Sequence, residues 1–349
     1  MTPDVYAFDR GPVLAIAGDE MARRHFAGEY GAAAALEPAT ASVDISFVNR
    51  GQGDGQGTYG RWVDGGHKTM RWSTSLSGPS AETLAARVSV SGWPRGYGLS
   101  MVQGYYVEPL LSVSAARNGA VLLPAAAFSV DGKAVVMMGL SGSGKTSLGM
   151  QALALGCPLL GDDQVLVTPD GYCRPFPRRM RLYPDLRLRV PLAYHRLPRS
   201  ARAALRMRRA ARFASRGWLS PSLALSCACM GQVDLPAPVP IGALVLLVRA
   251  PSPGEPRFSN ATTGEAIDYG VHALREQRQH LLEGRQDWAE AIRDVERVEA
   301  RLLGRAFACA PAVKVVVPTP LLGAHMAQLG WDLARYAADE PCSEERAWS

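Results

Sequence analysis

Hydrophobic and polar positions follow two different patterns along the 349-residue chain, and the pattern changes near residue 115. Before that point, short stretches such as 43–48 and 87–91 alternate between apolar and polar residues, and the Gly-rich segment 51–57 lies between them. Alternation with a period of two is typical of strands that bury one face. We therefore predict a small β-rich N-terminal domain over residues 1–115.

From residue 116 onward, short apolar runs alternate with stretches that have helical spacing. This succession predicts strands and helices in turn, as in an α/β nucleotide-binding core. Asp131 and Gly132 are a strong signal for a two-residue hairpin turn, and the continuous apolar run 241–248 is typical of a central parallel strand. The predicted strands are 121–123, 126–130, 134–138, 158–160 and 241–248, and the first predicted helix is 147–155.

The C-terminal third is predicted to be largely helical. Residues 264–303 are polar with apolar residues at helical spacing, so we expect helices packed on the core. The last residues, 336–349, are polar and are expected to form a frayed tail. Residues 116–335 are therefore assigned to one α/β domain.

Composition narrows the class of protein. With 47% hydrophobic and 20% charged residues, the chain is expected to fold as a globular protein, and no apolar run approaches the roughly 18 residues of a membrane span. The N-terminal residues lack the basic and apolar regions of a signal peptide. Six scattered cysteines without metal-ligand spacing are typical of reduced thiols. Together these features predict a cytoplasmic protein with no membrane partner.

The segment from Gly139 to Thr146 spells a complete P-loop, G-x-x-x-x-G-K-[ST], directly after an apolar run. Glycines at this spacing let successive backbone N–H groups surround phosphate oxygens, where a Cβ would block the approach. We expect Lys145 to reach the β- and γ-phosphates and the Thr146 hydroxyl to ligate Mg²⁺. The motif predicts a site for ATP and Mg²⁺ formed by Gly139, Ser141, Gly142, Ser143, Gly144, Lys145, Thr146 and Ser147.

Two adjacent acids, Asp162 and Asp163, follow the predicted strand 158–160. Carboxylates at the carboxyl end of a strand beside a P-loop face the crevice that holds the phosphates. One acid would hold Mg²⁺ while the other accepts a proton from an attacking hydroxyl. Both are catalytic candidates, and Asp163 is grouped with Thr146 as a metal ligand, although the sequence leaves open which acid has which role. An ordinary acidic turn is the alternative interpretation.

Positive charge is concentrated after this acidic pair. Residues 174–216 contain fourteen arginines and one acid, Asp185, whereas the whole chain has a net charge of +6. Arg178, Arg179 or Arg181 follows the pair closely enough to stabilise the γ-phosphate in a transition state, and Arg178 and Arg181 are the catalytic candidates. The later part, 199–216, has helical spacing and would either bind an acidic peptide or form a solvated surface.

The P-loop together with the segment 159–163, Leu-Leu-Gly-Asp-Asp, resembles the kinase core shared by HPr serine kinases and phosphoenolpyruvate carboxykinases. The order of hairpin, P-loop, acidic pair and basic segment is similar to that of HPr kinase-related proteins. The resemblance covers roughly residues 116–325. It implies a P-loop kinase domain over 116–335 beside the smaller β-rich domain, with ATP and Mg²⁺ as ligands and a serine-type hydroxyl as acceptor.

Departures from this family limit what the resemblance implies. Leu123 is followed by Pro124, where many HPr kinase-like sequences have a histidine, and the family's segment rich in Glu, Arg and Gly has no clear counterpart. The chain is also short for a carboxykinase. The resemblance therefore implies a related kinase with an acceptor other than HPr, and members of this wider group phosphorylate proteins, precursor peptides or small molecules.

These features predict transfer of the γ-phosphoryl group of ATP to a hydroxyl of a protein or precursor peptide, and the arginines favour an acidic one. Two alternatives stay open, namely a kinase for a small alcohol and an ATP-binding regulator without transfer activity. No nucleic-acid recognition module is evident in the sequence. Whether the chain forms a homo-oligomer also stays open.

Overall fold

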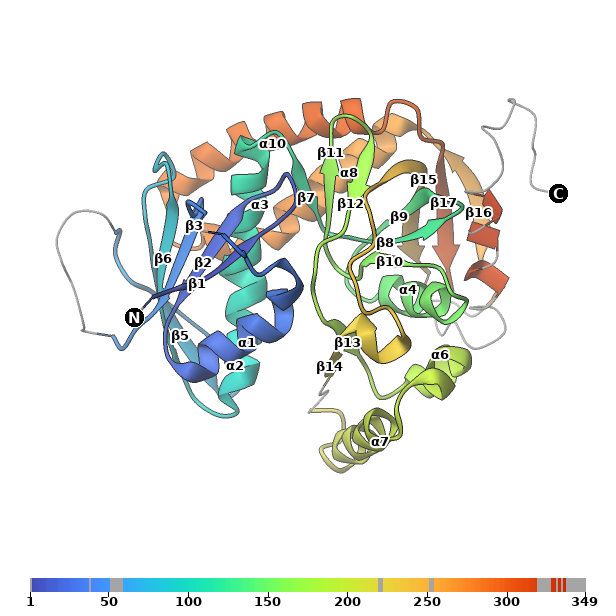
Figure 1. The fold of residues 1–349 in the computed structure, drawn as a ribbon, viewed down its shortest axis with the longest axis horizontal. Helices are drawn as coiled ribbons and strands as arrows, with labels where there is room; N and C mark the ends of the chain where they lie inside the picture. The colour runs from blue at the N-terminus through green and yellow to red at the C-terminus, as the bar shows by residue number, and fades with distance from the viewer. Residues whose placement is uncertain are drawn as a thin grey trace. The chain divides into compact units, whose positions relative to one another are not determined.

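The computed structural model describes residues 2–37, 39–50, 59–218, 222–250, 254–318, 328–330, 332–333 and 335–336. These residues form a mixed α/β fold, as the sequence predicts. The chain divides into two compact units, which Figure 1 shows: one contains residues 1–122 and 274–302, and the other contains residues 123–273 and 303–349. The Gly-rich segment 51–57 and residues 337–349 lie outside the described residues. Tyr336, assigned to the tail, instead lies in a helical turn against the core.

The first unit is built on a six-stranded mixed sheet with the order β1-β2-β3-β6-β5-β4. Strands β2, β3 and β6 are parallel, and the remaining pairs are antiparallel. The two alternating stretches 43–48 and 87–91 are confirmed as strands, the second as part of a longer one. The strands are β1 (Asp4–Ala7), β2 (Val13–Ala17), β3 (Val43–Phe47), β4 (Val63–His67), β5 (Met70–Leu76) and β6 (Leu84–Ser91).

The first unit also contains helices. The first helix begins where the Asp19 side chain accepts a hydrogen bond from the Ala22 N–H at 3.0 Å, which satisfies a backbone donor that has no partner within the helix. The helices are α1 (Glu20–Tyr30), α2 (Arg95–Val102), α3 (Glu108–Arg117), α9 (Gln279–Leu282) and most of α10 (Gln286–Ala306), with a 3₁₀ turn at Gly31–Ala33 and a π-helical turn at Gln103–Val107.

Residues 274–302 belong to this first unit, whereas the sequence assigned all of 116–335 to the second. Helices within 264–303 are confirmed, but much of this segment packs on the N-terminal sheet. The Trp288 Nε1–H donates to the Ser77 carbonyl, and an Arg285 N–H donates to the Thr74 carbonyl, both at 3.2 Å. Hydrophobic periodicity predicts an amphipathic helix, but it does not determine which sheet the apolar face meets.

The second unit contains most of a larger sheet, in which the strands of this unit have the order β10-β8-β9-β15-β12-β11, and β17 also pairs with β15 and with β16. These strands are β8 (Ala125–Val130), β9 (Lys133–Gly139), β10 (Leu159–Gly161), β11 (Val165–Thr168), β12 (Tyr172–Arg174), β15 (Val239–Arg249), β16 (Arg257–Ala261) and β17 (Ala312–Val317), and β7 (Val121–Leu123) lies at the boundary of the two units in the sequence. A separate two-stranded sheet joins β13 (Met180–Leu182) to β14 (Leu223–Leu225).

The expected hairpin and the central parallel strand are both confirmed. Val130 pairs with Lys133, and the two residues between them have positive φ, 47° at Asp131 and 75° at Gly132. This is the geometry of the turn that matches the twist of a hairpin. Strand β15, which contains the apolar run 241–248, is parallel to both β9 and β17.

Helix α4 (Lys145–Ala154) packs beside β8, β9 and β10 (Figure 1). Its apolar residues belong to the core that β9 and β15 also form. The other helices of this unit are α5 (Leu186–Arg189), α6 (Pro191–Arg196), α7 (Arg199–Ala214) and the greater part of α8 (Thr263–Gln277), with a 3₁₀ turn at Cys227–Met230.

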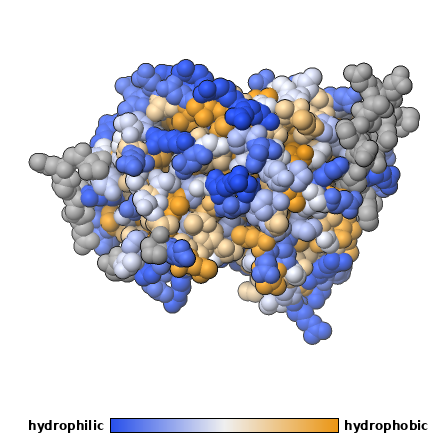
Figure 2. Space-filling view, turned by 45° about the horizontal axis from the view of Figure 1, so that its top comes forward, coloured by the Kyte–Doolittle hydropathy of each residue, from blue (hydrophilic) through white to orange (hydrophobic). Residues whose placement is uncertain are grey.

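Hydrophilic and hydrophobic residues are interspersed on the face of the molecule that Figure 2 draws. Among the described residues, no helix has both the length and the apolar character needed to cross a membrane.

Candidate functional site

The P-loop lies where β9 passes into α4. Strand β9 ends at Gly139, and α4 begins at Lys145 after Gly144, whose φ of 106° is a left-handed conformation that favours glycine. A Cβ on Gly139 would lie 2.2 Å from Ser143 Oγ, so the turn can close this tightly only with glycine there. The first backbone N–H groups of α4 are consequently directed at the space enclosed by the loop, as an anion-binding turn requires.

The acidic pair lies at the same sheet edge as the P-loop. Strands β9 and β10 are each antiparallel to β8, so they run in the same direction and their carboxyl ends meet at one edge. Gly139 ends β9, and Asp162 directly follows β10. The sequence expectation that these two segments converge therefore follows from the topology of the sheet.

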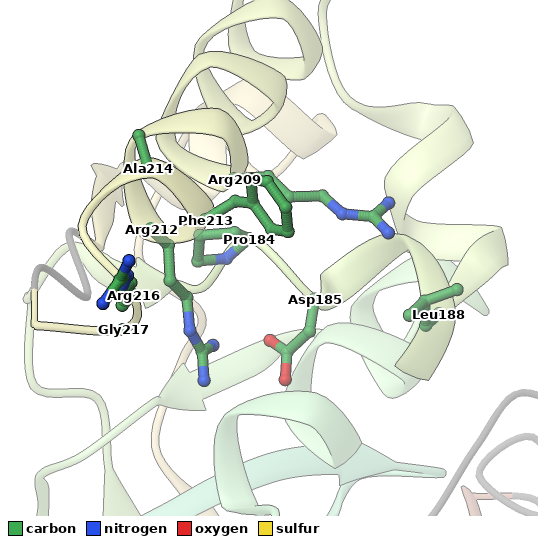
Figure 3. Close-up of a pocket in the computed structure, with 9 residues that line it drawn as sticks. All are labelled: Pro184, Asp185, Leu188, Arg209, Arg212, Phe213, Ala214, Arg216 and Gly217. Atoms are coloured by element: carbon green, nitrogen blue, oxygen red, sulfur yellow. The ribbon is translucent and has the colours of Figure 1, made fainter.

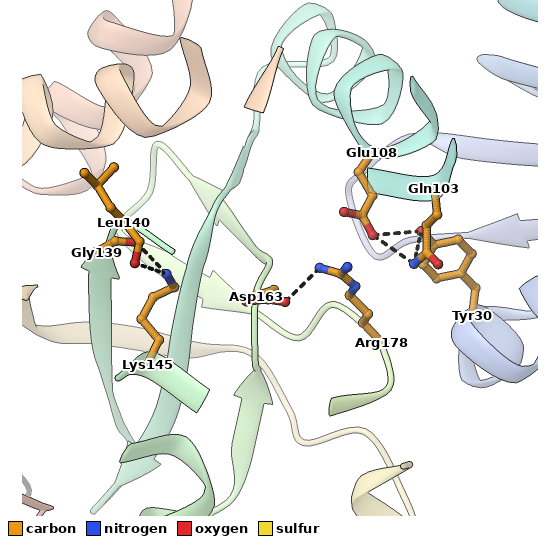
Figure 4. Close-up of polar contacts among 8 residues, drawn as sticks. All are labelled: Tyr30, Gln103, Glu108, Gly139, Leu140, Lys145, Asp163 and Arg178. Atoms are coloured by element: carbon orange, nitrogen blue, oxygen red, sulfur yellow. Dashed lines mark hydrogen bonds and ion pairs between the residues drawn. The ribbon is translucent and has the colours of Figure 1, made fainter. Parts of the chain in front are cut away.

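The side chain of Lys145 contacts the backbone of the P-loop. Its Nζ donates to the Gly139 carbonyl and, at 3.4 Å, to the Leu140 carbonyl, as Figure 4 shows. Burial lowers the pKa of Lys145, and the charges of Asp163 and Asp162 act in the opposite direction. The ammonium group is thus within electrostatic range of both acids, and it occupies a position from which it can exchange loop carbonyls for phosphate oxygens.

The hydroxyl residues of the motif occupy different environments. Ser143 is buried, and its Oγ has no hydrogen-bond partner among the described residues. Thr146 is half-buried on the first turn of α4, and its hydroxyl favours the charged form of Asp162. Ser141 lies exposed in the loop, and Ser147 is half-buried on α4. Ser143 therefore has a buried hydroxyl without a hydrogen-bond partner among the described residues, and the Thr146 hydroxyl lies beside Asp162.

Asp162 is the buried acid of the pair. It is 2% exposed, and neither carboxylate oxygen has a hydrogen-bond partner of normal geometry among the described residues. Burial, and then the charge of Asp163, raise its pKa to about 7, although the Thr146 hydroxyl and the Arg178 charge act against this shift. A buried carboxylate is expected to bind a cation or a proton when hydrogen bonds and nearby positive charge do not fully offset the cost of burying its negative charge.

Asp163 has a different environment from its neighbour. Its side chain is 38% exposed, and its carboxylate pairs with Arg178 at 3.2 Å (Figure 4). The Arg178 side chain is only 11% exposed, so this guanidinium is held beside the acids rather than in solvent. Arg181, the other predicted arginine, lies on β13 and presents its backbone N–H to Asp162.

Two residues that sequence reasoning missed also approach the P-loop. The Tyr269 hydroxyl, on α8, accepts the Leu140 N–H and donates to the Leu247 carbonyl, both at 3.3 Å. Arg249 ends β15, and its guanidinium would lie 3.3 Å from a Cβ on Gly142. Arg249 could have been found as the first charged residue after the central apolar strand, whereas no local pattern marks Tyr269.

In a comparison with known proteins, neither a protein-family model nor a curated protein matches the chain. Within the described ranges, no three His, Cys, Asp or Glu residues cluster in a way that could hold a metal ion by themselves. A metal at this site would therefore need oxygen ligands from a hydroxyl, a bound phosphate or water, which is the usual arrangement for Mg²⁺.

Proposed function

We propose that this protein is an ATP-dependent kinase that transfers the γ-phosphoryl group to a serine-type hydroxyl of a protein or peptide. The observation that carries the proposal is the meeting of a complete P-loop with two carboxylates of unequal burial at one sheet edge. The resemblance to the HPr kinase and carboxykinase core supports the same reaction class. We accordingly interpret the second unit as a P-loop kinase core of that type.

Thr146 and Asp162 are the residues that would hold an Mg²⁺ ion. The Asp162 oxygens lack hydrogen-bond partners of normal geometry among the described residues, the Thr146 hydroxyl is close to them, and hard oxygen ligands suit this ion. When bound, Mg²⁺ neutralises charge on the β- and γ-phosphate oxygens. The sequence grouped Asp163 with Thr146 as the metal ligand, but the proximity of Thr146 to Asp162 favours Asp162 for this role.

Asp163 is then the base. Its partly exposed carboxylate can meet an acceptor hydroxyl, whereas Asp162 is buried. Asp163 takes the hydroxyl proton as the acceptor oxygen bonds to the γ-phosphorus, and the bond from that phosphorus to the β–γ bridging oxygen breaks. Lys145 and Arg178 supply positive charge beside the transferring group.

A nucleotide-gated regulator is the second candidate, and a kinase for a small alcohol is the third. A regulator needs a metal ligand but no second carboxylate beside it, so the exposed Asp163 favours transfer. A small alcohol would use the same base and the same metal. The arginine-rich segment 174–216 favours a peptide or protein, because it adds an extended positive surface that a small alcohol does not need.

The proposal is tested by a single-turnover reaction with γ-labelled ATP and a lysate of the source cells. We expect label in a protein or peptide, as phosphoserine or phosphothreonine, and loss of this label in Lys145→Ala with the fold retained. The matched control is Lys133→Ala, which removes the lysine at the opposite end of β9 and should retain both ATP binding and transfer. Tight ATP binding without transfer would support the regulator, and full turnover of Lys145→Ala would exclude the P-loop mechanism.

A further inference from the structure

One face of helix α7 carries a row of arginines that ends in an aromatic residue. Its members are spaced three and four residues apart, so they lie along the same side of the helix. The face turned inward is buried in the core through Ala201 and Leu205. We call the outward row the arginine stripe, and its members are Arg199, Arg202, Arg206, Arg209 and Phe213.

The protein itself does not neutralise the stripe. Within the described residues, no carboxylate forms an ion pair with any of its four arginines. Asp185 is the one acid among residues 174–216, and it pairs with Arg189 at 2.7 Å. Like charges three and four residues apart repel on a helix. An anionic partner would relieve this repulsion.

A groove of about 640 Å³ opens at the C-terminal end of the stripe, and Figure 3 shows its lining. Apolar side chains of Pro184, Leu188 and Phe213 line it together with Asp185, and Arg209, Arg212 and Arg216 lie beside them. Phe213 is 88% exposed in this structure. An exposed ring beside apolar side chains in a groove flanked by several arginines offers both apolar and positively charged contacts to a partner.

We propose that the stripe and this groove dock an acidic segment of the acceptor, with carboxylates on the arginines and an apolar side chain beside Phe213. The stripe spans roughly 21 Å at about 1.5 Å per helical residue, which six or seven extended residues would cover. An anionic lipid surface would also meet the arginines, but a groove with apolar walls favours a single peptide side chain. The inference rests on the proposed kinase function only in assigning this segment to the acceptor.

The test measures binding without nucleotide, by fluorescence anisotropy. The probe is a labelled peptide of six glutamates with two leucines at each end. It is compared with two other peptides: one has glutamines in place of the glutamates, and the other has serines in place of the leucines. We expect only the first to bind tightly, and Arg202→Gln/Arg206→Gln/Arg209→Gln to weaken it about tenfold. Phe213→Ser should weaken the leucine peptide toward the affinity of the serine peptide.

The matched control is Arg293→Gln/Arg301→Gln/Arg305→Gln, which removes three exposed arginines from α10. It lowers the net charge equally and should leave binding unchanged. Equal weakening by both triple variants, or no binding of the acidic peptide, would overturn the proposal. Phosphatidylserine vesicles or a single-stranded oligonucleotide that bind more tightly than the peptide through the same arginines would overturn the choice of partner. Lys145→Ala should leave peptide binding intact, so failure of docking and failure of transfer are distinguishable.

Discussion

Replacement of Asp162 by Asn is expected to stabilise the nucleotide-free protein at alkaline pH while it removes transfer activity. Asp162 is buried, and burial is the main reason that its pKa rises from 3.8 to about 7. The charged form is therefore unfavourable in the folded state. Asn has a similar shape and no charge, so the variant lacks this penalty at every pH.

The sign and the size of the effect follow from the two pKa values. Because the pKa is higher in the folded than in the unfolded state, the folded state keeps a proton that the unfolded state releases above about pH 4, and stability falls as pH rises toward about 7. From pH 5.5 to about 7 is roughly 1.5 units, and each unit corresponds to about 1.4 kcal/mol. The wild type should therefore lose about 2 kcal/mol relative to Asp162→Asn over this interval.

The assay is urea unfolding of both proteins at pH 5.5 and at pH 8.0, without nucleotide or Mg²⁺. The free energy of unfolding of the variant minus that of the wild type should increase by about 2 kcal/mol between the two pH values. Asp163→Asn is the control, because loss of the neighbouring charge lowers the pKa of Asp162 and should reduce the pH dependence without abolishing it. A difference that is the same at both pH values would refute the reasoning.

Three further predictions concern the roles of the two acids, the binding of nucleotide and a buried ion pair. Both Asp162→Asn and Asp163→Asn should lower turnover by orders of magnitude, but only Asp162→Asn should change the Mg²⁺ dependence; equal Mg²⁺ dependence would contradict the assigned roles. Tyr269→Phe removes the hydroxyl that holds the Leu140 N–H, and titration with a fluorescent ATP analogue should show an affinity about 2- to 10-fold weaker at an unchanged melting temperature; unchanged affinity would exclude this positioning role. Glu299→Ala leaves the fully buried Arg278 without its carboxylate, and urea unfolding should show a loss of about 3–5 kcal/mol; a loss below about 1 kcal/mol would count against an energetically important buried pair.

Local patterns in the sequence determined many of the elements. The Asp131-Gly132 turn, the apolar run of β15 and the spacing of α7 each depend on residues a few positions apart, so the chain by itself predicts them. The P-loop is equally local, because one turn supplies its glycines, its lysine and its hydroxyl. The convergence of the P-loop with the acidic pair could be expected on a different ground, because strands that run in the same direction in one sheet end at the same edge.

Only the tertiary structure decided which distant segments meet. The sequence did not reveal that residues 274–302 pack with the N-terminal sheet, or that Tyr269 contacts the P-loop. It also could not separate the two adjacent acids, which are chemically identical but differ in environment, because Asp162 is buried beside Thr146 and Asp163 is partly exposed beside Arg178. Hydrophobic periodicity shows which side of a helix or strand is apolar. The burial and the pKa of a side chain depend instead on which other parts of the chain pack against it.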